Sequence, residues 1–452
     1  MKVSAVILAA GQGTRMRSKL PKVLHPICGR AQIEYSLRAA AGAGAEKIVV
    51  VVGHGAEQVR EVVGKRAVFA LQEQQLGTAH ALQSARPQVS GSAGLVLVIS
   101  ADMPLLTGET LSALVEAQRG SAGALSLLTV ISDHPRGFGR IVRGPDGSVA
   151  AIVEERDCTP EQLAIRELNV AAYCFNEAWL WGALERVKKS PKGEYYLTDV
   201  VALAAQDGLK VNAIVLQDPA EAMGINTRVH LAEAEAVMRQ RINQRHMLNG
   251  VTLIDPATTF IEDSVQIGMD TVVWPNTYLR GSTHIGEDCQ IGPNTMMDDC
   301  QVGNRCKVLA AVMEKAVLED DVDMGPFARL RKGAHLAQHV HMGNFGEVKD
   351  SYLGPGTKMG HFSYIGNAQI GPDVNIGAGT ITCNYDGVKK HPTEIGANVF
   401  IGSDTMLVAP VKIGDNSKTG AGSVVTHDVP PDTVVVGVPA RPLTKKTERQ
   451  DG

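Results

Sequence analysis

Up to about residue 228, short runs rich in β-branched residues alternate with stretches of helical pattern. The runs cover 3–8, 47–53 and 95–100, and the helical stretches cover 32–41, 57–63 and a segment from Thr110. The runs lack the alternation of apolar and polar residues that half-exposed strands show, as expected of parallel strands covered by helices on both faces. The pattern predicts an α/β sheet, whose ligands bind beyond the carboxyl ends of the strands.

After Gly250, a repeat of six residues replaces the alternation of strand-like and helix-like stretches. Inward positions recur at every sixth residue over 261–297, 318–348 and 395–425, and nearly all of them are apolar. Such a repeat predicts a flat strand followed by a corner, and three such faces close one coil. Coils stacked at strand spacing, about 4.8 Å, would form a prism of roughly ten coils. The pattern itself does not fix the handedness of the coil.

The six-residue register is interrupted at three places. It slips by one residue near Val302 and near Leu353, and it breaks between Thr382 and Glu394, where CNYDGVKKHPT reads as an inserted loop. Loops on a rigid scaffold often carry function. A plain solvent-exposed insertion stays open as the alternative.

One amphipathic helix is predicted between the two patterns. Residues 230–248 contain no Gly or Pro and carry apolar groups at Leu231, Ala234, Met238 and Ile242, spaced three and four apart. Asn249-Gly250 would end this helix. The predicted organisation is therefore a domain over 1–228, a linker helix over 229–249 and a second domain over 250–452.

Composition narrows the class of protein. The 452 residues carry 44 Lys and Arg against 48 Asp and Glu, a net charge of −4. The absence of a basic run argues against nucleic acid as a partner, and no segment approaches the roughly 18 apolar residues that cross a bilayer. The apolar N-terminus reads better as a buried strand entering a glycine loop than as a signal peptide. Seven scattered cysteines without a CxxC pair indicate reduced thiols, so we expect a cytoplasmic protein without membrane contact.

A phosphate-binding loop is the first candidate for chemistry. LAAGQGTRMRSKLPKVLH follows the first strand and fits neither GxGxxG nor the Walker A motif. Gly11 and Gly13 would allow close backbone approach, and Arg15 and Lys22 would neutralise phosphates. Taken alone, the loop is weak evidence, and a tight strand-to-helix turn with surface cations stays open as the alternative. Asp102 follows the strand at 95–100, where a metal-binding carboxylate belongs, although a helix cap would also explain an isolated Asp.

Further motifs follow in a specific order. They are Gln72 with Gly77-Thr78, then GFGR, IVEE, ELNV and GIN, and, in the six-residue repeats, FARLR, GNFGEVK, GHFSYIG, NIGAGT and TCNYDG. With these motifs the sequence resembles, over nearly its full length, the family of bacterial bifunctional N-acetylglucosamine-1-phosphate uridylyltransferases and glucosamine-1-phosphate N-acetyltransferases. The resemblance implies a Rossmann-like nucleotidyltransferase domain followed by a left-handed parallel β-helix, which assembles the protein as a homotrimer.

The same resemblance implies two reactions. Acetyl-CoA would acetylate glucosamine-1-phosphate, and UTP would then convert N-acetylglucosamine-1-phosphate to UDP-N-acetylglucosamine, a precursor of peptidoglycan, with release of pyrophosphate. In the first domain, Arg15 and Lys22 would act in catalysis, and one Mg²⁺ would bind to Asp102 and Asn226, whose oxygens suit a hard cation. The implied nucleotide-binding residues are Leu8, Gly11, Gly13, Lys22, Gln72, Gly77 and Thr78. The implied sugar-phosphate residues are Gly139, Glu154, Asn169 and Asn226.

In the β-helix, His361 is implied as the general base, because attack on a thioester requires an uncharged amine and imidazole titrates near working pH. Without the surrounding motifs, His361 would fit a solvated side chain. The implied sugar-phosphate residues are Arg331, Lys349, Tyr364, Asn375 and Lys390. The implied acetyl-CoA residues are Ala378, Asn384, Tyr385, Ser403, Ala421 and Arg441.

One departure and three alternatives accompany these assignments. Family members often carry an arginine before the final Val-Pro, where this chain has Gly437, so Arg441, Lys445 or Lys446 would take its place. A single-function sugar-nucleotide pyrophosphorylase with a structural or regulatory β-helix is the first alternative, and a non-enzymatic scaffold is the second. The third is a metal cluster at His335, His339 and His341, which lacks a thiol or carboxylate at telling spacing.

Overall fold

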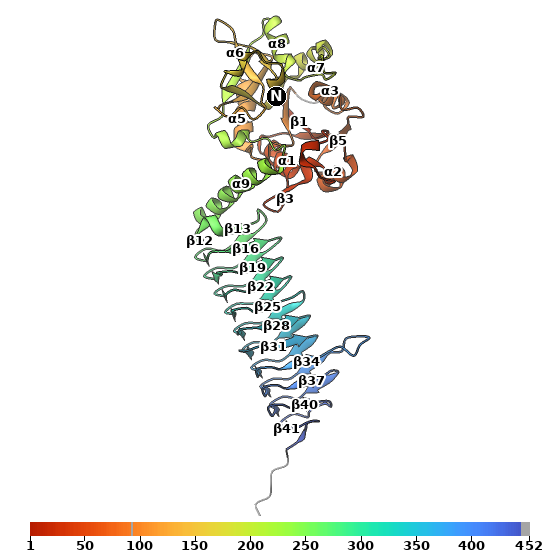
Figure 1. Ribbon diagram of the computed structural model, residues 1–452, viewed down its shortest axis with the longest axis vertical. Helices are drawn as coiled ribbons and strands as arrows, with labels where there is room; N and C mark the ends of the chain where they lie inside the picture. Colours follow the sequence, from red (N-terminus) through yellow and green to blue (C-terminus); the bar gives the residue numbers. More distant parts are fainter. Residues whose placement is uncertain (92–93, 444–452) are drawn as a thin grey trace, which may run out of the picture. The chain divides into compact units, whose positions relative to one another are not determined.

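The computed structural model describes residues 1–91 and 94–443. The chain forms two compact units, Met1–Met238 and a second unit that begins at Arg239 (Figure 1). The boundary falls inside α9 (Arg228–Leu248). In the first unit, Glu235 of this helix accepts a hydrogen bond from the Cys28 amide at 2.8 Å, and in the second, Arg245 pairs with Asp263 at 3.1 Å. Ala234 and Ile242, two of the apolar positions predicted for this helix, are buried.

A nine-stranded sheet forms the centre of the first unit. Its order is β11-β7-β10-β6-β1-β4-β5, and β8 and β9 pair beside β10. The strands are β1 (Val3–Leu8), β4 (Lys47–Val52), β5 (Val68–Leu71), β6 (Leu95–Ser100), β7 (Leu125–Ile131), β8 (Arg140–Arg143), β9 (Val149–Val153), β10 (Glu167–Asn176) and β11 (Val211–Val215). The short strands β2 (Pro26–Ile27) and β3 (Arg30–Ala31) pair separately.

Helices cover both faces of this sheet, as the apolar runs predict. Side chains of α1 (Gln32–Gly42), α2 (Ala56–Val63) and α5 (Gly108–Arg119) pack with Ala5 and Ile7 of β1 in one core. Side chains of α3 (Thr78–Ser84), α7 (Glu177–Arg186) and α8 (Asp199–Gln206) pack with Val6 in the other. The remaining short helices are α4 (Arg86–Val89), α6 (Pro160–Leu163), η1 (Thr14–Met16), η2 (Lys22–Leu24), η3 (Gly64–Arg66), η4 (Glu155–Asp157) and η5 (Pro219–Ala222).

The sheet is mixed rather than wholly parallel. β10 runs antiparallel to both β6 and β7, whereas β1 runs parallel to β4 and β6. The chain crosses from β1 to β4 on one side and later returns to β6 on the other. The carboxyl ends of β1 and β6 therefore flank a topological switch point, the place where open α/β sheets bind ligands.

Three sheets form the sides of the coil in the second unit, and their strands pair in parallel except for the last strand of the first sheet, which is antiparallel to its neighbour (Figure 1). Sheet one contains β12 (Thr252–Leu253), β15 (Val272–Val273), β18 (Gln290–Ile291), β21 (Lys307–Val308), β24 (Asp323–Met324), β27 (His341–Met342), β30 (Lys358–Met359), β33 (Asn375–Ile376), β36 (Phe400–Ile401), β39 (Lys418–Thr419), β41 (Val434–Val436) and β42 (Arg441–Pro442).

Sheet two contains β13 (Thr259–Ile261), β16 (Thr277–Arg280), β19 (Met296–Asp298), β22 (Val312–Glu314), β25 (Arg329–Leu330), β28 (Gly346–Lys349), β31 (Ser363–Gly366), β34 (Ile381–Cys383), β37 (Met406–Val408) and β40 (Val424–Val425). Sheet three contains β14 (Gln266–Ile267), β17 (His284–Ile285), β20 (Gln301–Val302), β23 (Val317–Leu318), β26 (Ala334–Leu336), β29 (Ser351–Leu353), β32 (Ala368–Ile370), β35 (Thr393–Ile395) and β38 (Val411–Ile413). The short helix η6 (Pro256–Thr258) precedes β13.

The predicted inward register is confirmed. The positions of the six-residue period are buried, except that Ile267 near the first coil is half-buried. Ile285 pairs with Val302 and Leu336 with Leu353, so the coil shortens at both predicted slips. Further shortened steps precede Met313, Leu318 and Ile370. None of the seven cysteines forms a disulfide, in agreement with the prediction of reduced thiols.

Candidate active sites

The loop after β1 shows why a glycine stands at position 13. Gly13 has φ 61°, in the left-handed region, and a Cβ there would lie 2.6 Å from Lys22 Cβ. Glycine therefore permits both the backbone conformation and the close passage of η2, which carries Lys22. Gly11 has open space around its missing side chain.

Lys22 joins two segments that are far apart in sequence. Its Nζ donates to Asp102 Oδ2 at 2.5 Å and to Asn226 Oδ1 at 3.2 Å. Asp102 follows β6, and its carbonyl accepts a hydrogen bond from the Ile225 amide at 2.9 Å, which fixes the segment that carries Asn226. Ser100 Oγ donates to the other Asp102 oxygen at 2.6 Å. The two predicted metal ligands are thus brought together.

The environment of Asp102 favours its ionised form. Burial alone would raise the pKa of this carboxyl, but the charge of Lys22 and hydrogen bonds from Lys22 and Ser100 outweigh burial and lower the pKa below its usual value. The site therefore presents a carboxylate and an amide oxygen to one cation, here the ammonium group of Lys22. This donor set fits a hard divalent cation that completes its shell with water and phosphate oxygens.

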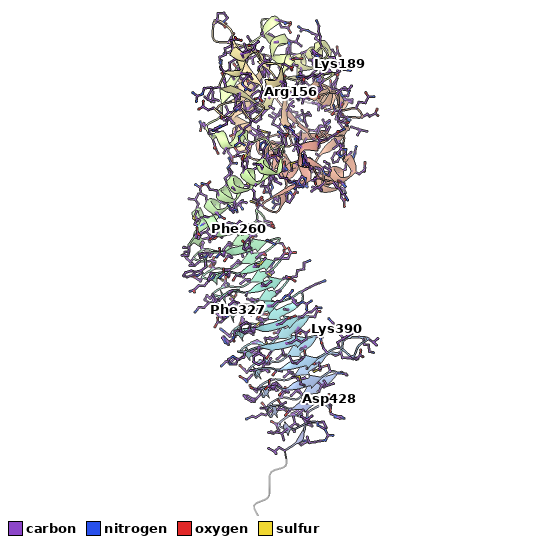
Figure 2. All side chains as sticks on the ribbon, viewed as in Figure 1. Arg156, Lys189, Phe260, Phe327, Lys390 and Asp428 are labelled. Atoms are coloured by element: carbon purple, nitrogen blue, oxygen red, sulfur yellow. The ribbon has the colours of Figure 1, made fainter. Side chains whose placement is uncertain are left out.

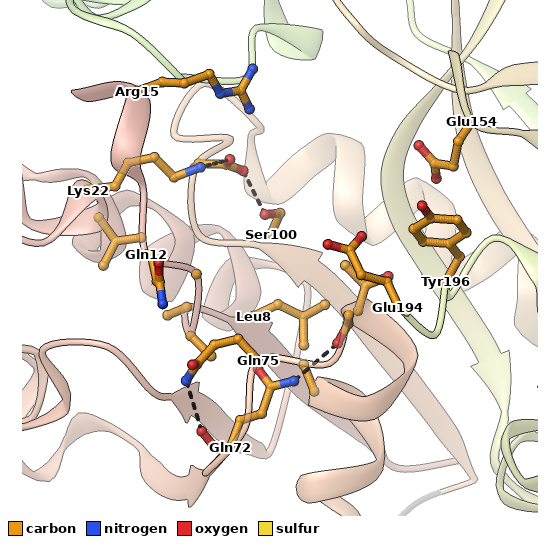
Figure 3. A pocket seen from close by; sticks show the side chains of 18 of the residues that line it. Leu8, Gln12, Arg15, Lys22, Gln72, Gln75, Ser100, Glu154, Glu194 and Tyr196 are labelled. Carbon is orange, nitrogen blue, oxygen red and sulfur yellow. Dashed lines mark hydrogen bonds and ion pairs between the residues drawn. The ribbon is translucent and has the colours of Figure 1, made fainter. Parts of the chain in front are cut away.

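A cavity of about 600 Å³ opens beside this cluster at the switch point. Figure 3 shows Lys22 and Arg15 on one side of it and Glu154, Glu194 and Tyr196 on the other. Nine of the predicted residues line it: Leu8, Gly11, Arg15, Lys22, Gln72, Gly77, Thr78, Asp102 and Glu154. The sequence reasoning missed Gln12, Gln75, Ser100, Arg156, Glu194 and Tyr196, which also line it.

Gln72 and Gly77 line the cavity and are held by hydrogen bonds and close packing. Gln72 is buried, and its Nε2 lies 3.1 Å from the Gly77 carbonyl oxygen and 3.0 Å from His80 Nδ1. Gly77 has φ 106°, and a Cβ there would lie 2.5 Å from the Tyr195 carbonyl oxygen. Backbone hydrogen bonds of 2.7 and 3.0 Å tie Tyr195 to Leu76 and Ala79. The segment with Glu194 and Tyr196 thereby becomes part of the cavity wall.

The predicted sugar-phosphate residues divide into two groups. Glu154 lines the cavity and accepts a hydrogen bond from Thr198 Oγ1 at 3.0 Å, and burial raises its pKa although that bond opposes the rise. Gly139 and Asn169 lie outside the cavity lining, joined to each other by a 2.9 Å backbone bond. The side-chain Nδ2 of Asn169 donates a hydrogen bond to Tyr173 Oη at 2.7 Å, so this group already has a partner within the protein.

Sheet two of the β-helix gathers three predicted cations. Lys349 ends β28, and Arg331 follows β25 one coil earlier. Lys390 lies on the loop between β34 and β35 (Figure 2). A hydrogen bond and charge repulsion from Lys390, followed by burial and the charge of Arg331, lower the pKa of Lys349. Arg331 also pairs with Glu347 at 3.1 Å. Lys349 Nζ also lies 3.8 Å from Asp350, whose charge opposes the fall in pKa. Three cations therefore share this face with two carboxylates, which leaves a positive charge suited to an anion.

Tyr364 and Asn384 meet above Gly366 beside these cations. A Cβ at Gly366 would lie 2.4 Å from Tyr364 Oη and 2.7 Å from Asn384 Nδ2. Asn384 is buried and donates to Asn367 Oδ1 at 2.8 Å. Asn375 instead lies on β33 of sheet one, so the described chain does not place it on the same side as Tyr364.

His361 lies at the corner between sheets one and two, and its exposed side chain makes no hydrogen bond to any residue that the structure describes. Its neighbour Phe362 begins a ladder along this corner. Gly379 N donates to the Phe362 carbonyl, Asp404 N to the Ala378 carbonyl and Gly422 N to the Ser403 carbonyl. Ala378, Ser403 and Ala421 therefore follow one another in successive coils below His361.

Tyr385 is exposed on the loop after β34, where its Oη donates to the Gly387 carbonyl at 2.7 Å. Arg441 lines a separate cavity of about 260 Å³ with His427 and Asp428. The other two cations considered for coenzyme A phosphates, Lys445 and Lys446, lie outside the described residues.

The histidine trio of the third alternative has separate acidic partners. His335 Nε2 lies 2.8 Å from Glu319, His341 Nδ1 lies 3.1 Å from Asp323, and His339 Nδ1 lies 3.9 Å from Asp321. Across residues 1–91 and 94–443, no group of three or more His, Cys, Asp or Glu side chains is arranged to hold a metal ion.

Comparison with known proteins supports both halves of the fold. The model of the MobA-like NTP transferase domain matches residues 5–165, and the model of the bacterial transferase hexapeptide matches 264–297 and 392–427. The bifunctional protein GlmU of Pelobacter propionicus is 47% identical over 438 residues, which cover 96% of this chain and 95% of that protein. Its counterpart in Heliobacterium modesticaldum is 48% identical over 436 residues, with coverages of 96% and 95%.

The chain belongs to the GlmU family.

This membership confirms the resemblance drawn from the ordered motifs. The GlmU fold consists here of an N-terminal nucleotidyltransferase domain and a left-handed parallel β-helix built from hexapeptide repeats. It also confirms the expected enzyme class, a bifunctional uridylyltransferase and acetyltransferase. In the part of this GlmU chain that the structure describes, no helix is both long and apolar enough to cross a membrane.

Proposed function

We propose that the cavity at the switch point of the first unit performs uridylyl transfer, and that the face of the β-helix around Lys349 performs acetyl transfer. The observation that carries the proposal is that two separate clusters form, each from motifs distant in sequence. One is the Lys22–Asp102–Asn226 contact beside the cavity, and the other is the cationic group of Arg331, Lys349 and Lys390.

For uridylyl transfer, UTP would occupy the cavity with its base near Gln72 and Gly77 and its phosphates near Lys22 and Arg15. The phosphate oxygen of N-acetylglucosamine-1-phosphate would attack the α-phosphorus, and pyrophosphate would leave. Because this oxygen is already an anion, no general base is required, and alignment with charge neutralisation supplies most of the catalysis. Asp102 and Asn226 would hold a Mg²⁺ ion, which supplies charge neutralisation at the phosphates when bound.

For acetyl transfer, the three cations would bind the phosphate of glucosamine-1-phosphate, and Tyr364 and Asn384 would position sugar or acyl donor. The amine nitrogen of glucosamine-1-phosphate would attack the thioester carbonyl while His361 takes a proton from this amine. The amide then forms and the coenzyme A thiol leaves. The exposed side chain of His361, free of hydrogen bonds among the described residues, is available to a substrate. Ala378, Ser403 and Ala421 continue along the corner, where an extended donor could lie.

We further propose that the protein works in the cytoplasm as a homotrimer assembled through the β-helix. Hexapeptide repeats and the family support oligomerisation. The absence of disulfides among the seven cysteines suits a reducing compartment. The proposed functional division keeps 1–228 for uridylyl transfer, 229–249 as the connecting helix and 250–452 for acetyl transfer.

Two point variants test the assignment of both sites. Lys22→Ala and His361→Ala are each assayed for pyrophosphate release from UTP and for thiol release from acetyl-CoA. We expect Lys22→Ala to lose uridylyl transfer by about 100-fold or more and to retain acetyl transfer, and His361→Ala to lose acetyl transfer by about 100-fold and to retain uridylyl transfer. Full acetyl transfer in His361→Ala would contradict its role as the base. Absence of thiol release by the unmodified protein would favour the single-function alternative.

A further inference from the structure

The Lys22 ammonium group stands between the two oxygens that the proposed function assigns to the metal. Its Nζ contacts Asp102 Oδ2 at 2.5 Å and Asn226 Oδ1 at 3.2 Å. The side chains of Lys22 and Asp102 are only 14% and 17% exposed, so water screens this pair weakly. Three separate segments, η2, the turn after β6 and the segment after η5, converge on this one cation position.

A divalent cation that binds Asp102 and Asn226 through these two oxygens would compete with the ammonium group of Lys22 for the same position. Mg²⁺ requires its oxygen ligands at about 2.0–2.1 Å, and Mn²⁺ suits the same oxygen donors. An ammonium group in contact with the same carboxylate oxygen would then lie almost against a doubly charged ion, and repulsion at that distance is strong in a partly buried site. Binding of the metal to both residues therefore requires Lys22 Nζ to leave its present position.

We propose that Lys22 competes with the divalent metal for Asp102 and Asn226. When the metal binds, the ammonium group of Lys22 leaves these two residues and contacts the nucleotide phosphates. The proposal rests on the assignment of Asp102 and Asn226 as metal ligands in the proposed function. Lys22 lines the cavity beside Arg15, so the displaced side chain has an anion-binding region within reach (Figure 3). One lysine thus serves as a counter-ion before the exchange and as a phosphate ligand after it.

The competition with Lys22 makes metal binding depend on whether nucleotide is bound. No group of three His, Cys, Asp or Glu side chains suited to a metal occurs in the described part of the chain, so the protein offers the ion few ligands of its own. Without nucleotide, the ion must also break the Lys22 pair. With nucleotide, phosphate oxygens supply further ligands and attract Lys22. Metal binding is therefore weak in the free enzyme and strongly coupled to nucleotide binding.

The test measures Mn²⁺ binding to the full-length, nucleotide-free protein by electron paramagnetic resonance of the unbound ion. Lys22→Met removes the ammonium group and keeps the length of the side chain, whereas Lys22→Arg keeps the charge. Arg15→Met is the matched control, because it also removes one positive charge from the cavity wall without touching Asp102. Asp102→Asn identifies the Mn²⁺ signal that belongs to this site. Thermal unfolding of each variant checks that it is folded.

We expect Lys22→Met to bind Mn²⁺ about tenfold more tightly than the unmodified protein, with Lys22→Arg and Arg15→Met within about threefold of it, because only the first frees the carboxylate. Equal tightening in Lys22→Met and Arg15→Met would overturn the proposal, since removal of charge alone would then explain the effect. Unchanged affinity in Lys22→Met would also overturn it. A Mn²⁺ signal that is insensitive to Asp102→Asn would instead contradict the metal assignment of the proposed function.

Discussion

At the scale of single residues, the proposed acetyl-transfer site brings together three positive charges, those of Arg331, Lys349 and Lys390. The Lys390 amine, by hydrogen bonding and charge, and the Arg331 guanidinium lower the pKa of Lys349. A lowered lysine pKa means that folding disfavours the charged form. The resulting penalty is present below the folded pKa and is relieved as pH rises toward the ordinary value of lysine. A phosphate dianion would remove the penalty at neutral pH by neutralising the cluster.

We therefore predict that Lys390→Ala raises the KM for glucosamine-1-phosphate about tenfold, because a charge-assisted contact to phosphate is lost. The change in kcat should be small, since Lys390 is not proposed to transfer protons. The same variant should unfold at a slightly higher temperature at pH 7, because repulsion of Lys349 is relieved. Steady-state kinetics and thermal unfolding measure both effects. Lys389→Ala, a neighbouring lysine on the same loop, is the control, and equal kinetic effects of the two variants would count against the cluster.

Single residues also show how far the sequence could predict the site. The glycine loop selected Lys22, the end of a strand selected Asp102, and only the family resemblance selected Asn226; the three residues meet in the structure. Neither Glu194 nor Tyr196 was selected, because they reach the cavity only through backbone pairing of Tyr195 with the Gly77 loop. Such pairing between loops leaves no period in the sequence. Motif order likewise could not show that Asn375 lies on a different sheet from Tyr364.

At the scale of elements, the glycine loop after β1 determines where η2 lies. Gly13→Ala would strain a left-handed backbone and would also push a Cβ to 2.6 Å from Lys22 Cβ. We predict a loss of uridylyl transfer of about tenfold or more, with acetyl transfer retained, because displacement of a catalytic group by even about 1 Å is costly. Assays of both half-reactions measure the outcome.

The matched control for this prediction is Gly44→Ala. Gly44 has a similar left-handed φ of 80°, but a Cβ there would contact nothing within 4 Å. It therefore adds backbone strain without a collision at Lys22. If both variants lost uridylyl transfer equally, general destabilisation rather than displacement of η2 would be the cause.

Helix α9 carries a buried titratable group near its end. Burial, with a smaller contribution from Arg245, lowers the pKa of His246 to about 4, although Asp263 opposes the shift. Between the ordinary histidine value near 6.5 and about 4, the unfolded chain binds a proton that the folded chain does not. Stability therefore falls as pH decreases through this window, by on the order of 3 kcal/mol in full.

We predict that His246→Leu reduces this acid sensitivity. The unfolding midpoint of the transition that involves the β-helix should fall less between pH 7 and pH 5 in the variant than in the unmodified protein. His427→Gln, at an exposed histidine, should leave the slope unchanged. A variant slope equal to that of the unmodified protein would show that His246 is not the responsible group.

The elements themselves were predicted to different degrees. The six-residue period predicted the three-sided coil, because each inward position must be small or apolar to fill a narrow prism. The shortened steps before Met313, Leu318 and Ile370 were not foreseen, because at most two six-residue steps separate each of them from the preceding slip, which is too short a run to show the register again. The antiparallel direction of β10 was equally hidden, because a buried strand is apolar whichever way it runs.

At the scale of the whole molecule, the proposed homotrimer must cover an apolar surface of the β-helix. Phe327, Phe345 and Phe362 are 62%, 60% and 56% exposed. The rings of Phe327 and Phe345 stack with centroids 5.5 Å apart and an interplanar angle of 15°. Large phenyl groups gathered in this way on a surface mark a contact region more often than isolated apolar residues do.

We predict that Phe345→Asp dissociates the oligomer, because a carboxylate in the middle of an apolar interface is left desolvated and unpaired. Sedimentation velocity at micromolar concentration should show a trimer for the unmodified protein and a monomer for the variant. Met269→Asp, which changes one exposed apolar residue at another corner, should remain trimeric. Phe362 adjoins His361, so dissociation should also reduce acetyl transfer, whereas uridylyl transfer in the first unit should persist. A trimeric Phe345→Asp protein would place the subunit interface on another face of the coil.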